Sequence, residues 1–150
     1  GSLYFNHLFP MGVASMCEAV DLVREGAAPR IEQDPSGGTY EGWCRADDVK
    51  MDWHQPVDSV YNIIRGANPQ PGAWTTLSGQ KLTVLDSARG EAIDAMPGTV
   101  ISVDETGMTI AGDGGSIVVS RVKTESGAKL SAVDFPGQLT VSVGDVLGAR

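Results

Sequence analysis

The chain has 150 residues, of which 41% are hydrophobic, so it can bury the core of one globular domain, or of a small domain plus a piece of another. Its 11 Lys and Arg residues against 19 Asp and Glu residues give a net charge of −8, which argues against a general phosphate-binding role. No apolar run approaches the ~18–20 residues needed to span a membrane, and no secretory leader is visible, so we expect a cytoplasmic protein.

The first expected element is a helix over residues 10–25, which Pro10 opens and Gly26 ends. Apolar residues recur along one face of it, at Val13, Met16, Cys17, Val20 and Val23. This face needs a surface to bury against, either the rest of the chain, a missing domain or a second copy through self-association. The start at Gly1-Ser2, without Met, favours a piece of a longer protein.

Residues 27–55 form a long connection that has no sustained hydrophobic period and contains several Pro and Gly breakers. Connections of this length are usually functional or interdomain. Because the segment is rich in apolar and aromatic residues, we expect it to be ordered across a domain surface. Short extended pieces are expected near residues 39–43 and 49–53.

Residues 56–74, PVDSVYNIIRGANPQPGAW, predict a second amphipathic helix followed by a rigid turn. Its apolar residues fall at i, i+3, i+4 and i+7, which is one face of a helix: Val57, Val60, Tyr61 and Ile64. Pro56 suits the first helical position and Gly66 suits the end. Two prolines and a glycine then form a turn that leads into a β-like run from Ala73.

Residues 75–150 indicate short strands separated by turn signals. We expect strands near residues 81–86, 98–103, 108–111, 116–123, 128–132, 139–143 and 146–147. The stretches 104–107 and 112–115 read as hairpin turns. The predicted fold is mainly β with N-terminal helices, and a small OB-like barrel of five to six strands is the architecture that fits best.

No set of residues indicates catalysis. His7 is expected in a structural role and His54 beside a helix start, and neither has a Ser, Cys or Asp partner at a recognisable spacing. The acidic loop containing Asp47, Asp48 and Asp52 lacks the spacing of a calcium loop and reads as a solvated face. The sequence therefore predicts no metal site.

Aromatic residues gather near the connection and the first strand, at Tyr40, Trp43, Trp53 and Trp74. They are interpreted either as packing groups or as a stacking surface for a planar ligand. Binding of single-stranded nucleic acid is disfavoured, because the β segment is acidic and poor in aromatic residues.

Three segments resemble the formyltetrahydrofolate-dependent formyl transferases: LYFNHLFPMGVASMCEAVDLVREGAAPRIEQ, GGTYEGW and KMDWHQPVDSVYNIIRGANPQPGAW. Within that family the TYEG and DWxQP forms are most similar to the hydrolase domain of 10-formyltetrahydrofolate dehydrogenase, and methionyl-tRNA formyltransferase is more distant. The resemblance covers residues 3–85 densely and residues 86–150 thinly.

The resemblance implies three parts. Residues 1–26 would hold the terminal helix of a Rossmann-like catalytic domain whose body is missing, residues 27–55 the interdomain linker, and residues 56–150 the C-terminal OB-like domain. The family's catalytic Asn, His and Asp match no position here, so no catalytic residue is assigned. Tyr40, Trp43 and Trp74 are expected at the rim of a small-molecule substrate site.

We therefore expect the non-catalytic C-terminal portion of an enzyme that passes the formyl group of 10-formyltetrahydrofolate to a small acceptor or to water. The fragment itself would be inactive and hold no cofactor. Nucleic acid is an unexpected partner, because residues 75–150 carry 6 basic against 9 acidic residues. A stand-alone β-barrel interaction module, or the tRNA-binding C-terminal domain of methionyl-tRNA formyltransferase, are the alternatives.

Overall fold

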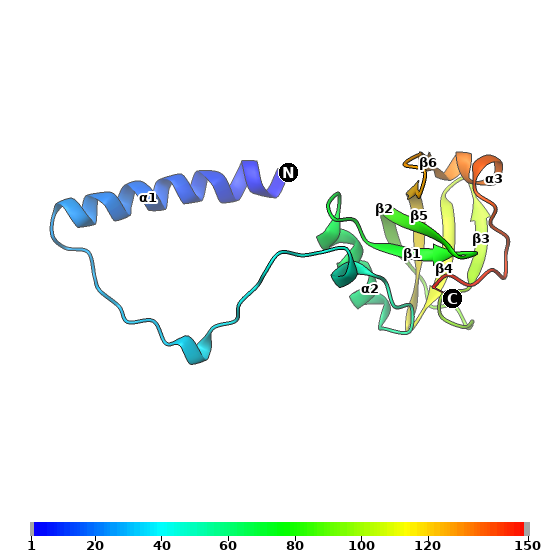
Figure 1. The fold of residues 1–150 in the computed structure, drawn as a ribbon, viewed down its shortest axis with the longest axis horizontal. Coiled ribbons are helices and arrows are strands. Elements are labelled where there is room, and N and C mark those ends of the chain that lie inside the picture. The colour runs from blue at the N-terminus through cyan, green and yellow to red at the C-terminus, as the bar shows by residue number, and fades with distance from the viewer. Residues whose placement is uncertain (1, 149–150) are drawn as a thin grey trace. The chain divides into compact units, whose positions relative to one another are not determined.

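The computed structural model describes residues 2–148 and divides the chain into two compact units, Gly1–Glu41 and Gly42–Arg150 (Figure 1). The first unit contains the expected N-terminal helix, and the second contains α2, the six strands and α3. Each unit is described by itself.

In the first unit the helix is longer than the sequence predicted. A π-helical segment, Tyr4–Leu8, runs directly into the α-helix α1, Phe9–Arg24. Pro10 lies near the start of α1, but the helical backbone continues before it, so its missing N–H removes one donor to the preceding turn, which is the π-helical one. Gly26, with a φ of +69°, stops the helix as expected. The only regular structure over residues 27–41 is a short 3₁₀ turn, Pro35–Gly37.

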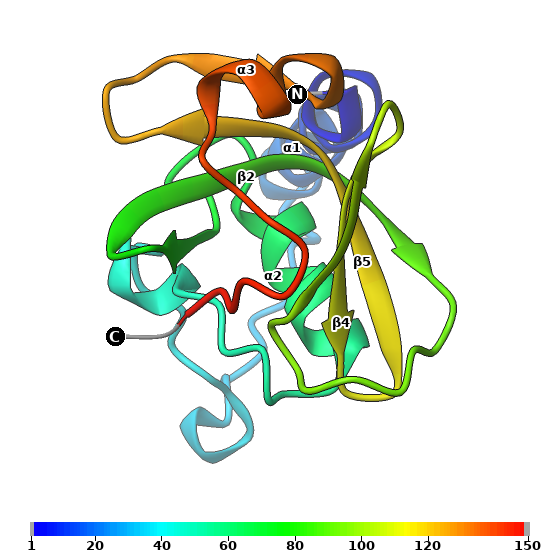
Figure 2. The same cartoon turned by 90° about the vertical axis from the view of Figure 1, so that its right-hand side faces the viewer.

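The second unit is built on six antiparallel strands and two helices, which confirms the prediction of a mainly β domain (Figure 2). Helix α2, Val57–Ala67, precedes the strands, and the four-residue helix α3, Phe135–Gln138, follows them. The strands are β1, Trp74–Leu77; β2, Gln80–Gly90; β3, Val100–Asp104; β4, Gly107–Gly112; β5, Gly115–Thr124; and β6, Lys129–Ser131.

The strands form one sheet in the order β1-β2-β5-β4-β3, with β6 also paired to β5. β2 and β5 are the longest strands, and β2 carries bulges between Val84 and Ser87. A bulge increases local twist and bends a strand. The bent sheet encloses a core to which every one of its longer strands contributes, including Leu82, Val100, Ile110 and Ile117.

Helix α2 packs its apolar face, Val60 and Ile64, into this core, as its periodicity predicted. Two details differ from the sequence prediction. Pro56 is the N-cap residue rather than the first helical residue, and the helix runs through Gly66 to end at Ala67. The turn between β4 and β5 lies at the start of α2, where Val57 N donates to Asp113 O at 2.8 Å.

The C-terminal segment corrects the sequence prediction. Residues 139–143 and 146–147 were expected to be strands, but neither stretch forms one: after α3, at residues 135–138, the chain continues as an irregular strap whose only β feature is an isolated antiparallel bridge between Val146 and Thr99. Ser131 and Asp134 make a capping box that starts a 3₁₀ turn, Ala132–Asp134, which leads into α3, and Phe135 is completely buried in the core. The Ser-x-x-Asp spacing before Phe-Pro indicates a helical turn, and the sequence analysis overlooked it.

The strap, residues 144–148, joins the two end strands of the sheet. On one side Val100 N donates to Asp145 O at 2.8 Å and Leu147 N donates to Gly98 O at 2.9 Å. On the other side Gly148 N donates to Thr76 O in β1 at 2.8 Å. Backbone groups that would otherwise be left open at both edges are satisfied in this way.

Candidate functional site

Trp74 is the predicted site residue with the most contacts. It opens β1, is half-buried, and donates from its indole Nε1 to Ala46 O at 2.7 Å. The Nζ atom of Lys81 lies 4.4 Å from the centre of its ring, and that of Lys50 lies 5.3 Å away. These distances allow cation–π attraction. The ring therefore holds residues 46–50 against β1 and is covered by two ammonium groups of its own chain.

Tyr40 and Trp43 lie in different surroundings. Tyr40 belongs to the first unit and is 95% exposed, and Trp43 belongs to the second unit and is 92% exposed. Their exposed rings would suit a planar partner, whereas the half-buried ring of Trp74 already lies beside two lysine ammonium groups. The structure thus separates the three expected residues into two exposed rings and one clamped ring.

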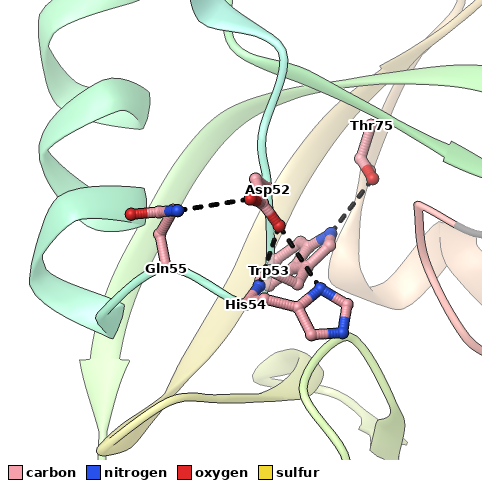
Figure 3. Close-up of polar contacts among 5 residues, drawn as sticks. All are labelled: Asp52, Trp53, His54, Gln55 and Thr75. Atoms are coloured by element: carbon pink, nitrogen blue, oxygen red, sulfur yellow. Dashed lines mark hydrogen bonds and ion pairs between the residues drawn. The ribbon is translucent and has the colours of Figure 1, made fainter.

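Trp53 is a core residue, although it is part of the same aromatic group in the sequence. It is 2% exposed, and its Nε1 donates to Thr75 Oγ1 in β1 at 3.0 Å (Figure 3). Gly148 lies close to the edge of its indole, where a Cβ would be only 3.3 Å from Trp53 Cδ1. The segment from Val49 to Trp53 consequently belongs to the core of the β unit, and Met51 N donates to Trp74 O at 2.8 Å.

Asp52 organises the turn that leads into α2. Its Oδ1 accepts from the backbone N–H of His54 at 3.0 Å and lies 3.3 Å from His54 Nδ1, while Oδ2 accepts from Gln55 Nε2 at 3.3 Å (Figure 3). The His54 amide and then the Gln55 amide lower the pKa of Asp52 below its ordinary value. The turn carries His54 beside the helix start, as expected, and gives Asp52 a structural role that sequence reasoning missed.

A groove of about 530 Å³ opens at one end of the β unit, between the β1–β2 hairpin, the β5–β6 hairpin and the residues after α3. Its lining includes the apolar residues Leu82 and Leu130 and polar residues such as Gln80, Lys81 and Glu125. None of the three expected site residues lines it.

The helix of the first unit presents a continuous apolar face. The side chains of Tyr4, Leu8, Val13 and Met16 lie along one side of it and are all at least half exposed. Solvent-exposed apolar surface of this extent marks an interaction site more often than a free surface.

Groups suited to bond-breaking chemistry are scarce over residues 2–148. The buried polar residues are Thr75, Thr83 and Ser116. Within that range no three His, Cys, Asp or Glu side chains are arranged to hold a metal ion, and no described helix could cross a membrane. His54 is exposed and contacts only Asp52 through its ring.

The antiparallel sheet, the preceding α2 and the clamped Trp74 define a small domain that is mainly β. The family model described as formyl transferase, C-terminal domain matches residues 44–138, so the chain belongs to the formyl transferase family. The resemblance inferred from the sequence is thereby confirmed.

Among its relatives, the cytosolic 10-formyltetrahydrofolate dehydrogenase of Xenopus laevis is 36% identical over 144 residues, which is 89% of this chain and 16% of that protein. The methionyl-tRNA formyltransferase of Bacillus velezensis is 34% identical over 139 residues, covering 91% of this chain and 44% of that protein. This chain therefore spans less than half of either relative.

A solved structure shows the same fold. HypX from Aquifex aeolicus in complex with tetrahydrofolic acid aligns with a TM-score of 0.61 at 19% identity, over 87% of this chain and 23% of that one. A HypX variant aligns with a TM-score of 0.67 at 18% identity, over 91% of this chain and 25% of that one.

Proposed function

We propose that this chain is the non-catalytic C-terminal portion of an enzyme that uses 10-formyltetrahydrofolate and passes its formyl group to a small acceptor or to water. The observation that carries the proposal is the family match over residues 44–138, in a β unit in which no His, Cys, Asp, Glu, Lys or Arg side chain is buried among the described residues. Relatives that are named for 10-formyltetrahydrofolate support the proposal that this compound is the substrate. One of them is named a cytosolic enzyme, which supports a cytoplasmic location.

The described residues fit a supporting role better than a complete folate site. A pterin ring needs a pocket with stacking faces and amide-type hydrogen bonds, and the clamped face of Trp74 offers neither. Tyr40 and Trp43 present free rings but are exposed nearly in full. In the proposal these two residues contribute to the rim of a site whose reacting groups lie elsewhere in the full-length enzyme.

In the same proposal, the apolar face of α1 is a contact surface for the catalytic domain. Tyr4, Leu8, Val13 and Met16 would pack against the part of the enzyme that precedes this chain, as the terminal helix of its catalytic domain. A second copy of this chain could cover the same face if the β unit acts alone as an interaction module. Replacing Val13 and Met16 with Glu would then abolish self-association of the chain, measured by sedimentation.

The proposal is tested by an assay of formyl release. This chain, mixed with 10-formyltetrahydrofolate, is expected to give no tetrahydrofolate above the uncatalysed background, whereas the full-length gene product is expected to release it. Turnover by the chain alone would overturn the non-catalytic assignment. A full-length protein that is folded and yet leaves 10-formyltetrahydrofolate intact would overturn the assignment of this compound as the substrate.

A further inference from the structure

The four lysines of the chain come from three separate stretches of the sequence and lie on one face of the sheet. Trp74 pairs with Thr83, Thr83 pairs with Lys123, and Lys123 pairs with Lys129. Directly paired residues point to the same side of a sheet. Lys50 bridges to Trp74 from outside β1, and Lys81 reaches over the same ring from β2. We call Lys50, Lys81, Lys123 and Lys129 the lysine row.

The burial pattern agrees with this placement. Leu82, Val122 and Leu130, which flank the row residues along their strands, are buried in the core, whereas Lys50, Lys81 and Lys129 are exposed and Lys123 is half-buried. Thr83, between Trp74 and Lys123 on the same face, is buried next to Gly72, so the row borders a covered position in its middle. With strands ~4.8 Å apart, the four steps from Lys50 to Lys129 span about 19 Å. The row therefore forms a narrow basic stripe across the outside of the sheet.

The row lacks acidic partners. Over residues 2–148 the ion pairs are made by arginine or histidine, including Arg121 with Asp86 next to the row, and none is made by lysine. Lys123 and Lys129 are directly paired across β5 and β6, an arrangement of like charges that disfavours the sheet. An external anion would neutralise this repulsion.

Three observations restrict the anion. The β unit carries 9 basic against 13 acidic residues over 42–150, so a long polyanion that extended beyond the stripe would meet repulsion. The Trp74 ring is covered by Lys50 and Lys81, which disfavours stacking of nucleic-acid bases on it. The row consists of lysine rather than arginine, and lysine acts as a point charge that does not require bidentate geometry.

We propose that the lysine row binds the glutamyl tail of a folate, a short extended chain of carboxylates. This inference rests on the proposed function, because one group of relatives is named for 10-formyltetrahydrofolate and the similar HypX structure holds tetrahydrofolic acid. Each added glutamate brings one carboxylate, so affinity increases with tail length until the row is filled. The pterin end remains free for the reacting site of the full-length enzyme.

Calorimetric titration of the 150-residue chain at low salt tests the proposal, with pteroyl-γ-pentaglutamate and folic acid as probes. The pentaglutamate is expected to bind at least tenfold more tightly than folic acid, and the binding is expected to weaken with added salt. Equal affinity for the two probes, or no binding of the pentaglutamate, would overturn the proposal.

Variants locate the site. Lys123→Gln combined with Lys129→Gln is expected to weaken pentaglutamate binding about fivefold to tenfold, since each exposed charge pair contributes little alone. Lys129→Arg keeps the charge and is expected to keep the affinity. Arg65→Gln removes an exposed charge on α2, outside the row, and is the matched control. An unchanged affinity in the folded double variant would place the ligand elsewhere and overturn the proposal.

Two further probes distinguish the source of the anion. A single-stranded RNA oligonucleotide or an α-linked acidic peptide that binds more tightly than the pentaglutamate would overturn the folate assignment. The titration measures binding without turnover. A full-length enzyme that fails to release formyl would thus refute the proposed function, while a failed titration refutes only the role of the row.

Discussion

The indole nitrogen of Trp53 donates a hydrogen bond of 3.0 Å to the hydroxyl of Thr75, and both residues are buried. Thr75→Val keeps the shape of the side chain and leaves the indole N–H without its acceptor. The free energy of unfolding is expected to fall by about 1–3 kcal/mol, which urea denaturation measures. Thr140→Val, at an exposed position, is the matched control. A loss no larger than the control's would show that the bond contributes nothing to stability.

Gly115 lets the β4–β5 turn approach the start of α2. A Cβ at this position would lie 2.8 Å from Val57 Cγ1, which is closer than packed carbon atoms allow. Gly115→Ala is expected to lower the free energy of unfolding by about 1–3 kcal/mol. Adding Val57→Ala should relieve part of the clash, and Gly137→Ala, which meets no atom within 4 Å, serves as the control. A double variant that is no better than the sum of the single ones would contradict the contact.

The lowered pKa of Asp52 makes its contribution to stability depend on pH. Because the pKa is lower in the folded than in the unfolded state, the contribution is present above about pH 4 and is lost as pH falls through the folded value. Asp52→Asn is therefore expected to destabilise most near neutral pH, and the difference from the parent chain should shrink towards pH 3. Chemical denaturation at several pH values measures it. A difference that is constant with pH would mean that charge at Asp52 is irrelevant.

Trp74 fastens residues 46–50 to β1 through its bond to Ala46 O. Trp74→Phe keeps an aromatic ring and removes the donor. Amide hydrogen exchange is expected to become faster at Asp48, Val49 and Lys50, while α2 stays protected. Trp43→Phe, at a ring that is 92% exposed, should leave exchange unchanged. Equal protection in both variants would argue against the fastening.

The like-charged pair Lys123 and Lys129 is expected to cost stability in the free protein. Lys129→Gln should therefore raise the free energy of unfolding by about 0.2–1 kcal/mol at low salt, and the gain should diminish at high salt. Thermal denaturation at two salt concentrations measures both effects. Lys50→Gln, which removes a lysine that has no directly paired lysine, is the comparison. A destabilised Lys129→Gln chain would show that the pair is not repulsive.

Periodicity predicted much of the fold. The i, i+3, i+4 and i+7 pattern of α2 and the turn glycines of the hairpins depend on local chemistry, which a sequence displays directly. The end of the chain was less predictable. Leu139 and Val141 alternate as in a strand, but Phe135 is drawn into the core and forces the chain into a helical turn before them.

The candidate site was harder to predict from the sequence than the fold. Trp53 and Trp74 both lie near the start of the β unit in the sequence, yet one is a core residue in a turn and the other is half-buried at the start of β1, a difference that tertiary packing decides. The lysine row could not be predicted from the sequence either, because strand pairing brings its members together. Successive members of the row lie up to 42 positions apart in the sequence, between Lys81 and Lys123, and the net acidic composition gives no sign that they lie together.

The strap at residues 144–148 has a consequence for anyone who trims this protein. It is hydrogen-bonded both to the start of β3 with the residues before it and to β1, so its removal would expose the backbone groups of both edge strands. Exposed edge strands pair with strands of other molecules. A version shortened at Ser142 should consequently precipitate on storage or form mixed oligomers, even though every strand of the sheet would still be encoded.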